Sequence, residues 1–126
     1  MKALRPKELE LMSLFWNTSK PLTSAEVKAL ATEYSWGGSS CNVMIDRLKK
    51  LSFLEVAGNF QKRHFICNTY RAAISKDKYF AEFISESIGQ VNPALIIHFL
   101  SNLKESGNLS QNAIEEIQKA LKAWRN

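Results

Sequence analysis

The spacing of apolar residues changes along the chain, and this change limits the folds that the chain can adopt. Over roughly the first fifty residues, apolar side chains recur every three or four positions, which is typical of amphipathic helices. From Leu54 to Tyr70 they alternate, which is typical of paired strands. After residue 73 the helical spacing returns. The sequence therefore predicts a mainly α-helical protein with one small β-hairpin in its middle.

Start and stop signals divide the first fifty residues into three short helices. Pro6 suits the first position of a helix because its φ angle is already fixed near the helical value. Thr23 and Glu26 have the spacing of a capping box, which marks a second helix start. Gly37-Gly38 permits a sharp turn before a third helix. The sequence thus predicts helix, turn and helix before the hairpin.

The hairpin completes an order of elements that belongs to one fold. We interpret Gly58-Asn59 as a turn region and place Gln61, Lys62 and Arg63 near the tip or on the return strand. Helix, tight turn, helix and basic hairpin is the order of a winged helix-turn-helix. We therefore predict a winged-helix domain over residues 1–72 and a three-helix domain over residues 73–126.

The third predicted helix has one apolar and one polar face. Its apolar positions point inward, so the outward face is small and polar at its start and basic at its end. In a winged helix-turn-helix this helix enters the major groove, and the hairpin contacts the DNA backbone beside it. The predicted DNA-binding side chains are Ser39, Ser40, Asn42, Val43, Arg47, Lys49, Lys50, Lys62 and Arg63.

Each predicted contact also has an ordinary alternative. Asn42 can bond adenine in bidentate fashion and Val43 can touch a thymine methyl group, although simple solvation also explains an Asn. Ser40 can cap the helix instead of bonding DNA. The basic residues are interpreted as phosphate ligands because they cluster. Asp46 would repel phosphate unless it accepts from cytosine or pairs with the basic side chain of Arg47 or Lys50, and we favour this pairing.

The net charge of +5 is confined to one half of the 126-residue chain. Residues 1–72 hold eleven basic and six acidic side chains, whereas residues 73–126 hold six of each. A basic half beside a neutral half indicates a polyanionic partner such as double-stranded DNA. A solvated surface with a modest bias is the alternative.

Several classes of protein are not expected. We find neither a convergent nucleophile and base nor a glycine-rich phosphate loop, so the chain is not predicted to be an enzyme or to hold a cofactor. Cys41 and Cys67 lack CxxC spacing and are too few for a disulfide framework, which indicates a cytoplasmic protein without a metal site. The longest apolar run, ALIIHFL, is too short for membrane insertion. The N-terminus lacks the apolar core of a signal peptide.

The last fifty residues are too apolar for a domain of their size. In ALIIHFL, apolar side chains cover nearly the whole circumference of a helix, which requires burial on several sides. A second copy of the same segment would supply that burial, and packing against the first domain is the alternative. The predicted homodimer interface comprises Tyr79, Phe83, Ile88, Leu95, Ile96, Phe99, Leu100, Ile117 and Leu121.

The ordered segments resemble the penicillinase repressor (BlaI/MecI) family of bacterial winged-helix regulators. LRPKELELMSLFW is similar to the family's opening helix L-T-x-x-E-x-x-V-M-x-x-L-W, with matches at Leu4, Glu8, Met12 and Trp16. WGGSSCNVMIDRLKKLSFLEV resembles W-S-x-x-T-V-x-T-x-L-x-R-L-x-x-K-G-x-L, with matches at Trp36, Arg47, Leu48 and Leu54. YRAAISKDKYFAEFISESI is similar to the entry into the family's dimerisation helices.

The resemblance implies a transcriptional repressor that binds a pseudo-palindromic operator as a homodimer and excludes RNA polymerase. Family members that respond to β-lactams look like they are cut by a partner membrane sensor protease at an Asn-Phe step. The matching position here reads His98-Phe99, which departs from that step and weakens the expectation of a cleavage site. Two other functions stay open: an adaptor whose basic face binds an acidic protein, and a regulator with a small-molecule pocket between its lobes.

Overall fold

The computed structural model describes residues 3–34 and 40–125 and divides the chain into two compact units, residues 1–84 and 85–126. The first unit contains helices α1 (Pro6–Trp16), α2 (Ser24–Leu30) and α3 (Cys41–Lys50), a short 3-10 turn (Ala31–Glu33), and strands β1 (Leu22–Thr23), β2 (Leu54–Lys62) and β3 (Phe65–Ala72). Helix α4 (Lys76–Ile88) runs across the boundary, and α5 (Pro93–Glu105) and α6 (Gln111–Trp124) form the second unit.

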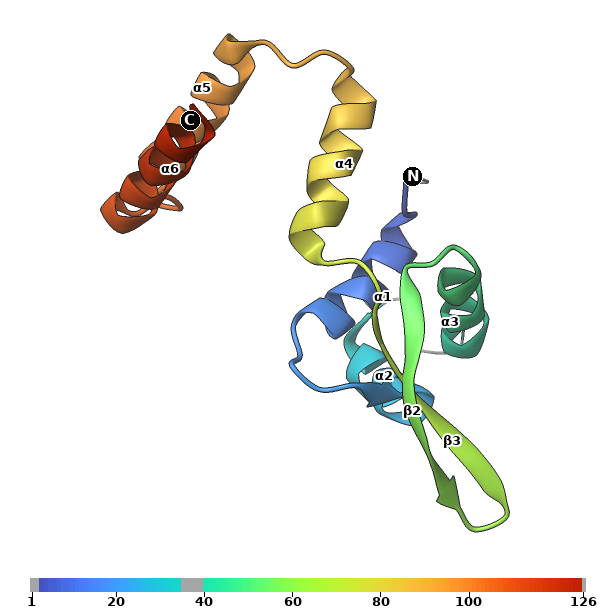
Figure 1. Ribbon diagram of the computed structural model, residues 1–126. Coiled ribbons are helices and arrows are strands. Elements are labelled where there is room, and N and C mark those ends of the chain that lie inside the picture. Colours follow the sequence, from blue (N-terminus) through green and yellow to red (C-terminus); the bar gives the residue numbers. More distant parts are fainter. Residues whose placement is uncertain (1–2, 35–39, 126) are drawn as a thin grey trace. The chain divides into compact units, whose positions relative to one another are not determined.

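The first unit is a winged helix-turn-helix. Its three strands form an antiparallel sheet in the order β1-β3-β2, and α1, α2 and α3 pack together beside that sheet (Figure 1). Strand β1 holds the sheet to the helices by pairing Leu22 with Tyr70 and Thr23 with Thr69. The predicted fold class, mainly α with a hairpin wing, is confirmed.

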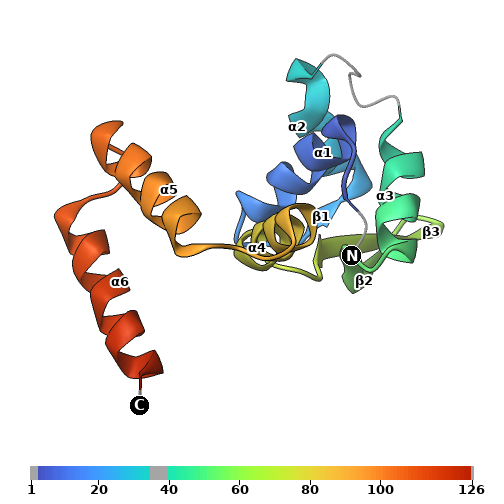
Figure 2. The same ribbon diagram turned by 90° about the horizontal axis from the view of Figure 1, so that it is seen from above.

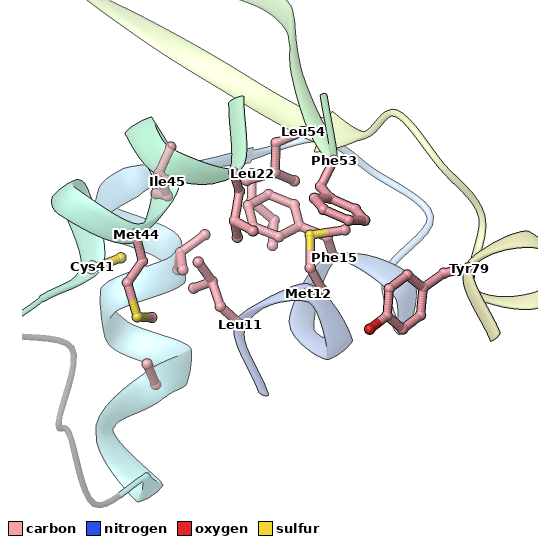
Figure 3. Close-up of a cluster of buried hydrophobic side chains, with 13 residues drawn as sticks. Leu11, Met12, Phe15, Leu22, Cys41, Met44, Ile45, Phe53, Leu54 and Tyr79 are labelled. Carbon is pink, nitrogen blue, oxygen red and sulfur yellow. The ribbon is translucent and has the colours of Figure 1, made fainter. Parts of the chain in front are cut away.

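A single apolar core holds the first unit together (Figure 3). It draws side chains from all three helices and from the start of β2, and its fully buried large members are Leu11, Met12, Val27, Ile45 and Leu48. Removing a leucine side chain of this kind from water stabilises the fold by about 1.5–3 kcal/mol. The core therefore fixes which face of α3 points outward.

The predicted start of α2 is confirmed by its hydrogen bonds. The Thr23 hydroxyl accepts from the Glu26 backbone N–H at 3.1 Å, and the Thr23 backbone N–H donates to Glu26 Oε1 at 3.0 Å. These bonds satisfy two backbone groups that the first turn of a helix leaves unpaired. The bond from the Thr23 backbone, followed by that from its hydroxyl, lowers the pKa of the Glu26 carboxyl.

The turn of the hairpin lies further along the chain than predicted. Lys62 pairs with Phe65, so Arg63 and His64 form the tip, and Arg63 adopts a left-handed φ of 55°. The interpretation of Gly58-Asn59 as a turn is wrong, because both residues lie inside β2. Gly58 instead follows a register shift after Val56, and glycine is common at such bulges.

Helix α4 begins within the first unit. Tyr79 is 3% exposed, its hydroxyl accepts a hydrogen bond from the Leu4 backbone N–H at 2.9 Å, and its ring packs near those of Trp16 and Phe53. The compact unit therefore extends to residue 84, beyond the boundary predicted after residue 72. The prediction that Tyr79 lies in a dimer interface is wrong, because this side chain is enclosed by its own chain.

The second unit is a helical hairpin in which α5 and α6 are joined by a turn at Gly107 (Figure 2). The side chains of Asn92 and Ser110 cap the two helices by accepting from the backbone N–H groups of Leu95 and Ala113 at 2.9 and 3.1 Å. No residue of α5 or α6, both described throughout, is buried. This unit therefore has well-formed helix starts but no enclosed core of its own.

Candidate nucleic-acid interface

Helix α3 presents a polar face away from the core. Cys41, Met44, Ile45 and Leu48 are buried on its inner side, as the apolar spacing predicts. On the opposite side the exposed residues are Ser40, Asn42, Val43, Asp46 and Lys50. Val43 has 72% of its surface exposed, which is high for a β-branched apolar side chain. The helix thus offers small side chains that can approach a surface closely.

The start of α3 places Ser40 on this outer face. The Ser40 carbonyl accepts from the Met44 N–H at 3.0 Å, and its hydroxyl makes no capping hydrogen bond within the described chain. The Ser40 side chain therefore does not cap α3, and its predicted contact with DNA stays a prediction. Ser39, which precedes it, lies outside the described residues.

The basic end of α3 is divided between two environments. Lys50 is exposed, whereas the Lys49 ammonium lies 5.6 Å from the centre of the Tyr70 ring on β3. Such a cation–π contact contributes about 0.5–1 kcal/mol at a partly exposed site. Lys49 thereby connects the end of the helix to the hairpin that follows it.

Arg47 is tied to the interior. Its Nε forms an ion pair with Oε2 of Glu8, a carboxylate that is only 3% exposed. The other oxygen of Glu8 accepts the Arg5 backbone N–H at 2.9 Å, at the start of α1. Arg47 therefore joins α3 to α1 through Glu8, while 32% of its side chain stays exposed, and its assignment as a phosphate ligand stays a prediction. Sequence reasoning identified Glu8 only as a match to the family's opening helix and missed its capping role, although an acidic residue three positions into a helix is a known capping signal.

The hairpin places two predicted basic residues at its tip. Lys62 ends β2 and Arg63 occupies the turn, and both side chains are exposed. Their neighbours Phe60, Phe65 and Ile66 are also exposed, which the sequence had not led us to expect. The tip of the hairpin is therefore both cationic and apolar.

The predicted interface residues of the later helices remain accessible, except for Tyr79. Phe83 stacks on Tyr79 with 5.9 Å between ring centres but keeps 37% of its surface exposed. Ile88, Leu95, Ile96, Phe99 and Leu121 are exposed, and Leu100 and Ile117 are half-buried along a groove between α5 and α6. The His98-Phe99 step lies inside α5, with both side chains exposed.

The cysteines have different surroundings. Cys41 is buried against the first turn of α2, and this burial raises the pKa of its thiol, an effect that nearby Lys28 opposes. Cys67 lies half-exposed on β3. Within residues 3–34 and 40–125, no three His, Cys, Asp or Glu side chains are grouped closely enough to bind a metal ion. None of the described helices has the length and apolar character needed to cross a membrane.

Comparison with protein families gives a match to the penicillinase repressor family over residues 4–123. The chain belongs to the penicillinase repressor family. This match covers nearly the whole sequence and therefore includes both units. Penicillinase repressors are transcriptional regulators and not enzymes. A comparison with curated proteins finds no match.

Proposed function

We propose that this penicillinase repressor family member binds a pseudo-palindromic operator as a homodimer and represses transcription by excluding RNA polymerase. The observation that carries the proposal is the uncovered outer face of α3, with Asn42 and Val43 exposed above a fully packed inner face. Asn42 would bond an adenine edge and Val43 would contact a thymine methyl group. Ser40, and Ser39 before it, would bond nearby base edges or phosphates.

The charge of the first unit supports a nucleic-acid partner. Lys50 near the end of α3 and Lys62 and Arg63 at the hairpin tip are exposed cations that can each neutralise a phosphate. Lys49 could neutralise a further phosphate if its ammonium moved away from the Tyr70 ring. Arg47 holds α3 against α1 through its ion pair with Glu8, and 32% of its side chain stays exposed beside the outer face of α3.

The composition of the second unit supports a homodimer. Large apolar side chains on α5 and α6 are exposed, and no residue of these helices is buried. A second copy would cover them, and its twofold axis would place two α3 helices at half-sites about one helical turn apart or a small multiple.

The proposal is tested by selecting binding sequences from a random duplex library and then titrating the best duplex with salt. We expect a two-fold-symmetric site and, for about three phosphates neutralised per copy, a log–log slope of about −5. Asn42→Ala should lose discrimination at one position of each half-site, and Lys50→Gln should reduce the slope. Lys119→Gln on α6 serves as the charge-matched control and should change neither. Failure of the wild-type chain to bind any duplex at low salt would overturn the proposal in favour of a protein partner.

A further inference from the structure

The outer face of α3 carries an exposed carboxylate, that of Asp46. Figure 3 shows Met44 and Ile45 directed into the core, and a turn of about 100° per residue places the next residue, Asp46, on the outer side of the helix. On that side it lies between Asn42 and Lys50, which are also exposed. An acid therefore stands in the middle of the surface that is proposed to meet DNA.

The fold gives no structural reason for an acid at this position. Asp46 lies beyond the first turn of α3, where an acid would be favoured by the helix dipole, and just before the basic last turn, where the dipole disfavours it. Aspartate is also one of the weaker helix formers. Because the side chain is exposed, it fills no space in the core. Asp46 therefore adds nothing to the stability of α3.

The cations closest to Asp46 in the sequence do not neutralise it. Arg47 pairs with Glu8, and the Lys49 ammonium lies over an aromatic ring of β3. Lys50, one turn further on, forms no ion pair with Asp46, and the carboxylate has no hydrogen-bond partner within the part of the chain that the structure describes. The pairing with Arg47 or Lys50 that the sequence favoured is therefore not formed, which leaves acceptance from cytosine.

An unpaired carboxylate restricts the DNA that α3 can approach. Phosphates repel it, so its presence against a duplex is unfavourable unless it accepts a hydrogen bond there. In the major groove, guanine and thymine present only acceptors or a methyl group, and adenine presents an acceptor beside its amino donor. Cytosine alone presents an amino donor, at N4, without an acceptor on the same base. Cytosine is therefore the base that suits this carboxylate.

The spacing along α3 suits base reading by Asp46. It follows Asn42 by four residues and Val43 by three, the separations at which side chains lie on one face of a helix. Four residues advance by about 6 Å along a helix, and successive base pairs are about 3.4 Å apart. Asp46 would thus stand about two base pairs from the pair read by Asn42. The small side chains of Ser40 and Val43 permit the close approach that a short carboxylate needs.

We propose that Asp46 accepts a hydrogen bond from the N4 amino group of a cytosine in each half-site and so determines the base at that position. This inference rests on the proposed function and deepens it. At a guanine or thymine the carboxylate would face an acceptor and remain unpaired. Asp46 therefore lowers affinity for DNA in general and favours one sequence, which is specificity through repulsion as well as attraction.

The test begins with selection from a random duplex library by the full-length protein and by Asp46→Ala. The wild type should select a cytosine about two base pairs from the position whose preference Asn42→Ala loses. Replacing this cytosine should weaken wild-type binding about 10-fold. Asp46→Ala should lose this discrimination and bind unrelated duplexes more tightly. Asp77→Ala removes an exposed acid from α4 and should keep the preference. Circular dichroism melting checks that both variants fold.

A modified duplex tests the hydrogen bond itself. Methylation at N4 of the selected cytosine keeps the hydrogen that pairs with guanine and replaces the one that projects into the major groove. Wild-type affinity should fall about 10-fold, as for a mismatched base. The affinity of Asp46→Ala should not change, because this variant makes no bond there. The same methylation at a cytosine outside both half-sites is the control and should have no effect on either protein.

Three results would overturn the inference while the proposed operator binding stands. If Asp46→Ala tightens binding to all duplexes equally and selects the wild-type site, Asp46 is only a repelling surface charge. If N4 methylation leaves wild-type affinity unchanged, the carboxylate does not accept from this cytosine. If Asp77→Ala changes the selected site in the same way, the effect comes from net charge. Failure of the wild type to bind any duplex would instead remove the proposed function together with this inference.

Discussion

Leu48 on α3 and Phe99 on α5 are both large apolar side chains in the middle of helices, yet their surroundings differ. Leu48 is fully buried in a core shared by three helices and a sheet, whereas 53% of Phe99 is exposed. The first unit therefore gains its stability within one chain. The second unit has capped helices and apolar side chains but no enclosed interior, so we expect its stability to depend on protein concentration.

The largest effect is expected from a charge placed on the exposed apolar surface of the second unit. Phe99→Asp should weaken the proposed dimer about 100-fold or more, since an unpaired carboxylate would be buried at its interface. Sedimentation equilibrium measures this. Asn112→Asp adds the same charge to α6 on the side away from Ile114 and should leave the dimer intact. If the wild-type chain stays monomeric at micromolar concentrations, the second unit does not depend on a second copy for its stability.

In the first unit, the next largest effect is expected on the stability of the fold, from removing a buried apolar side chain. Leu48→Ala should lower the free energy of unfolding by about 3 kcal/mol, through reduced burial and the cavity left behind. Leu30→Ala removes the same atoms from a side chain that is 51% exposed and should cost less than about 1 kcal/mol. Urea unfolding compares the two variants. Equal effects would show that the described core does not hold α3 in place.

The elements and the inner face of α3 could be predicted from sequence because their signals are local. The Thr23 capping box and Pro6 act over three or four residues, and the spacing of Cys41, Ile45 and Leu48 follows directly from helix geometry. Gly58 misled the prediction, since a glycine that permits a bulge has the same local appearance as one that permits a turn.

Contacts between distant residues could not be predicted in this way. Arg47 and Glu8 are 39 positions apart, and neither residue type by itself indicates that they meet. Tyr79 has the helical spacing of the later helices, so its pattern gave no sign that it packs into the first unit. Residue type identified Arg47 as a cation, but only tertiary structure shows that it pairs with the buried Glu8 carboxylate.

The Glu8–Arg47 ion pair gives a smaller test of how the first unit holds α3. Glu8→Gln should cost about 1–2 kcal/mol, because an amide still accepts from the Arg5 N–H but leaves the partly buried guanidinium without its counter-charge. Glu55→Gln breaks the exposed pair with Arg71 and should cost under about 0.5 kcal/mol. Thermal melts of both variants measure the difference. A larger loss of stability for Glu55→Gln would contradict the role given to Glu8.

The smallest effect concerns one turn that occurs in both units. After α3 the N–H groups of Ser52 and Phe53 donate to the carbonyls of Lys49 and Leu48, and after α5 those of Gly107 and Asn108 donate to Lys104 and Leu103 in the same pattern. The left-handed position is Ser52 at φ 66° in the first unit and Gly107 at φ 80° in the second.

Two separate substitutions at these positions should have opposite effects on the free energy of unfolding. Ser52→Gly should stabilise the first unit by up to about 1 kcal/mol, and Gly107→Ser should destabilise the second by a similar amount, because a side chain is disfavoured at positive φ. A Cβ at position 107 would meet no neighbour within 4 Å, so backbone conformation alone is tested. Chemical denaturation of each variant gives the sign. Destabilisation by Ser52→Gly would show that the serine side chain contributes more than its backbone costs.

The burial of Tyr79 has a practical consequence for dissecting the protein. A fragment that stopped at Ala72 would lack Tyr79, expose the rings of Phe53 and Trp16, and remove the acceptor of the Leu4 N–H. A shortened chain ending at Ile84 would keep these interactions and omit α5 and α6. Such a fragment would separate what a single copy contributes to the proposed operator binding from what the proposed pairing adds.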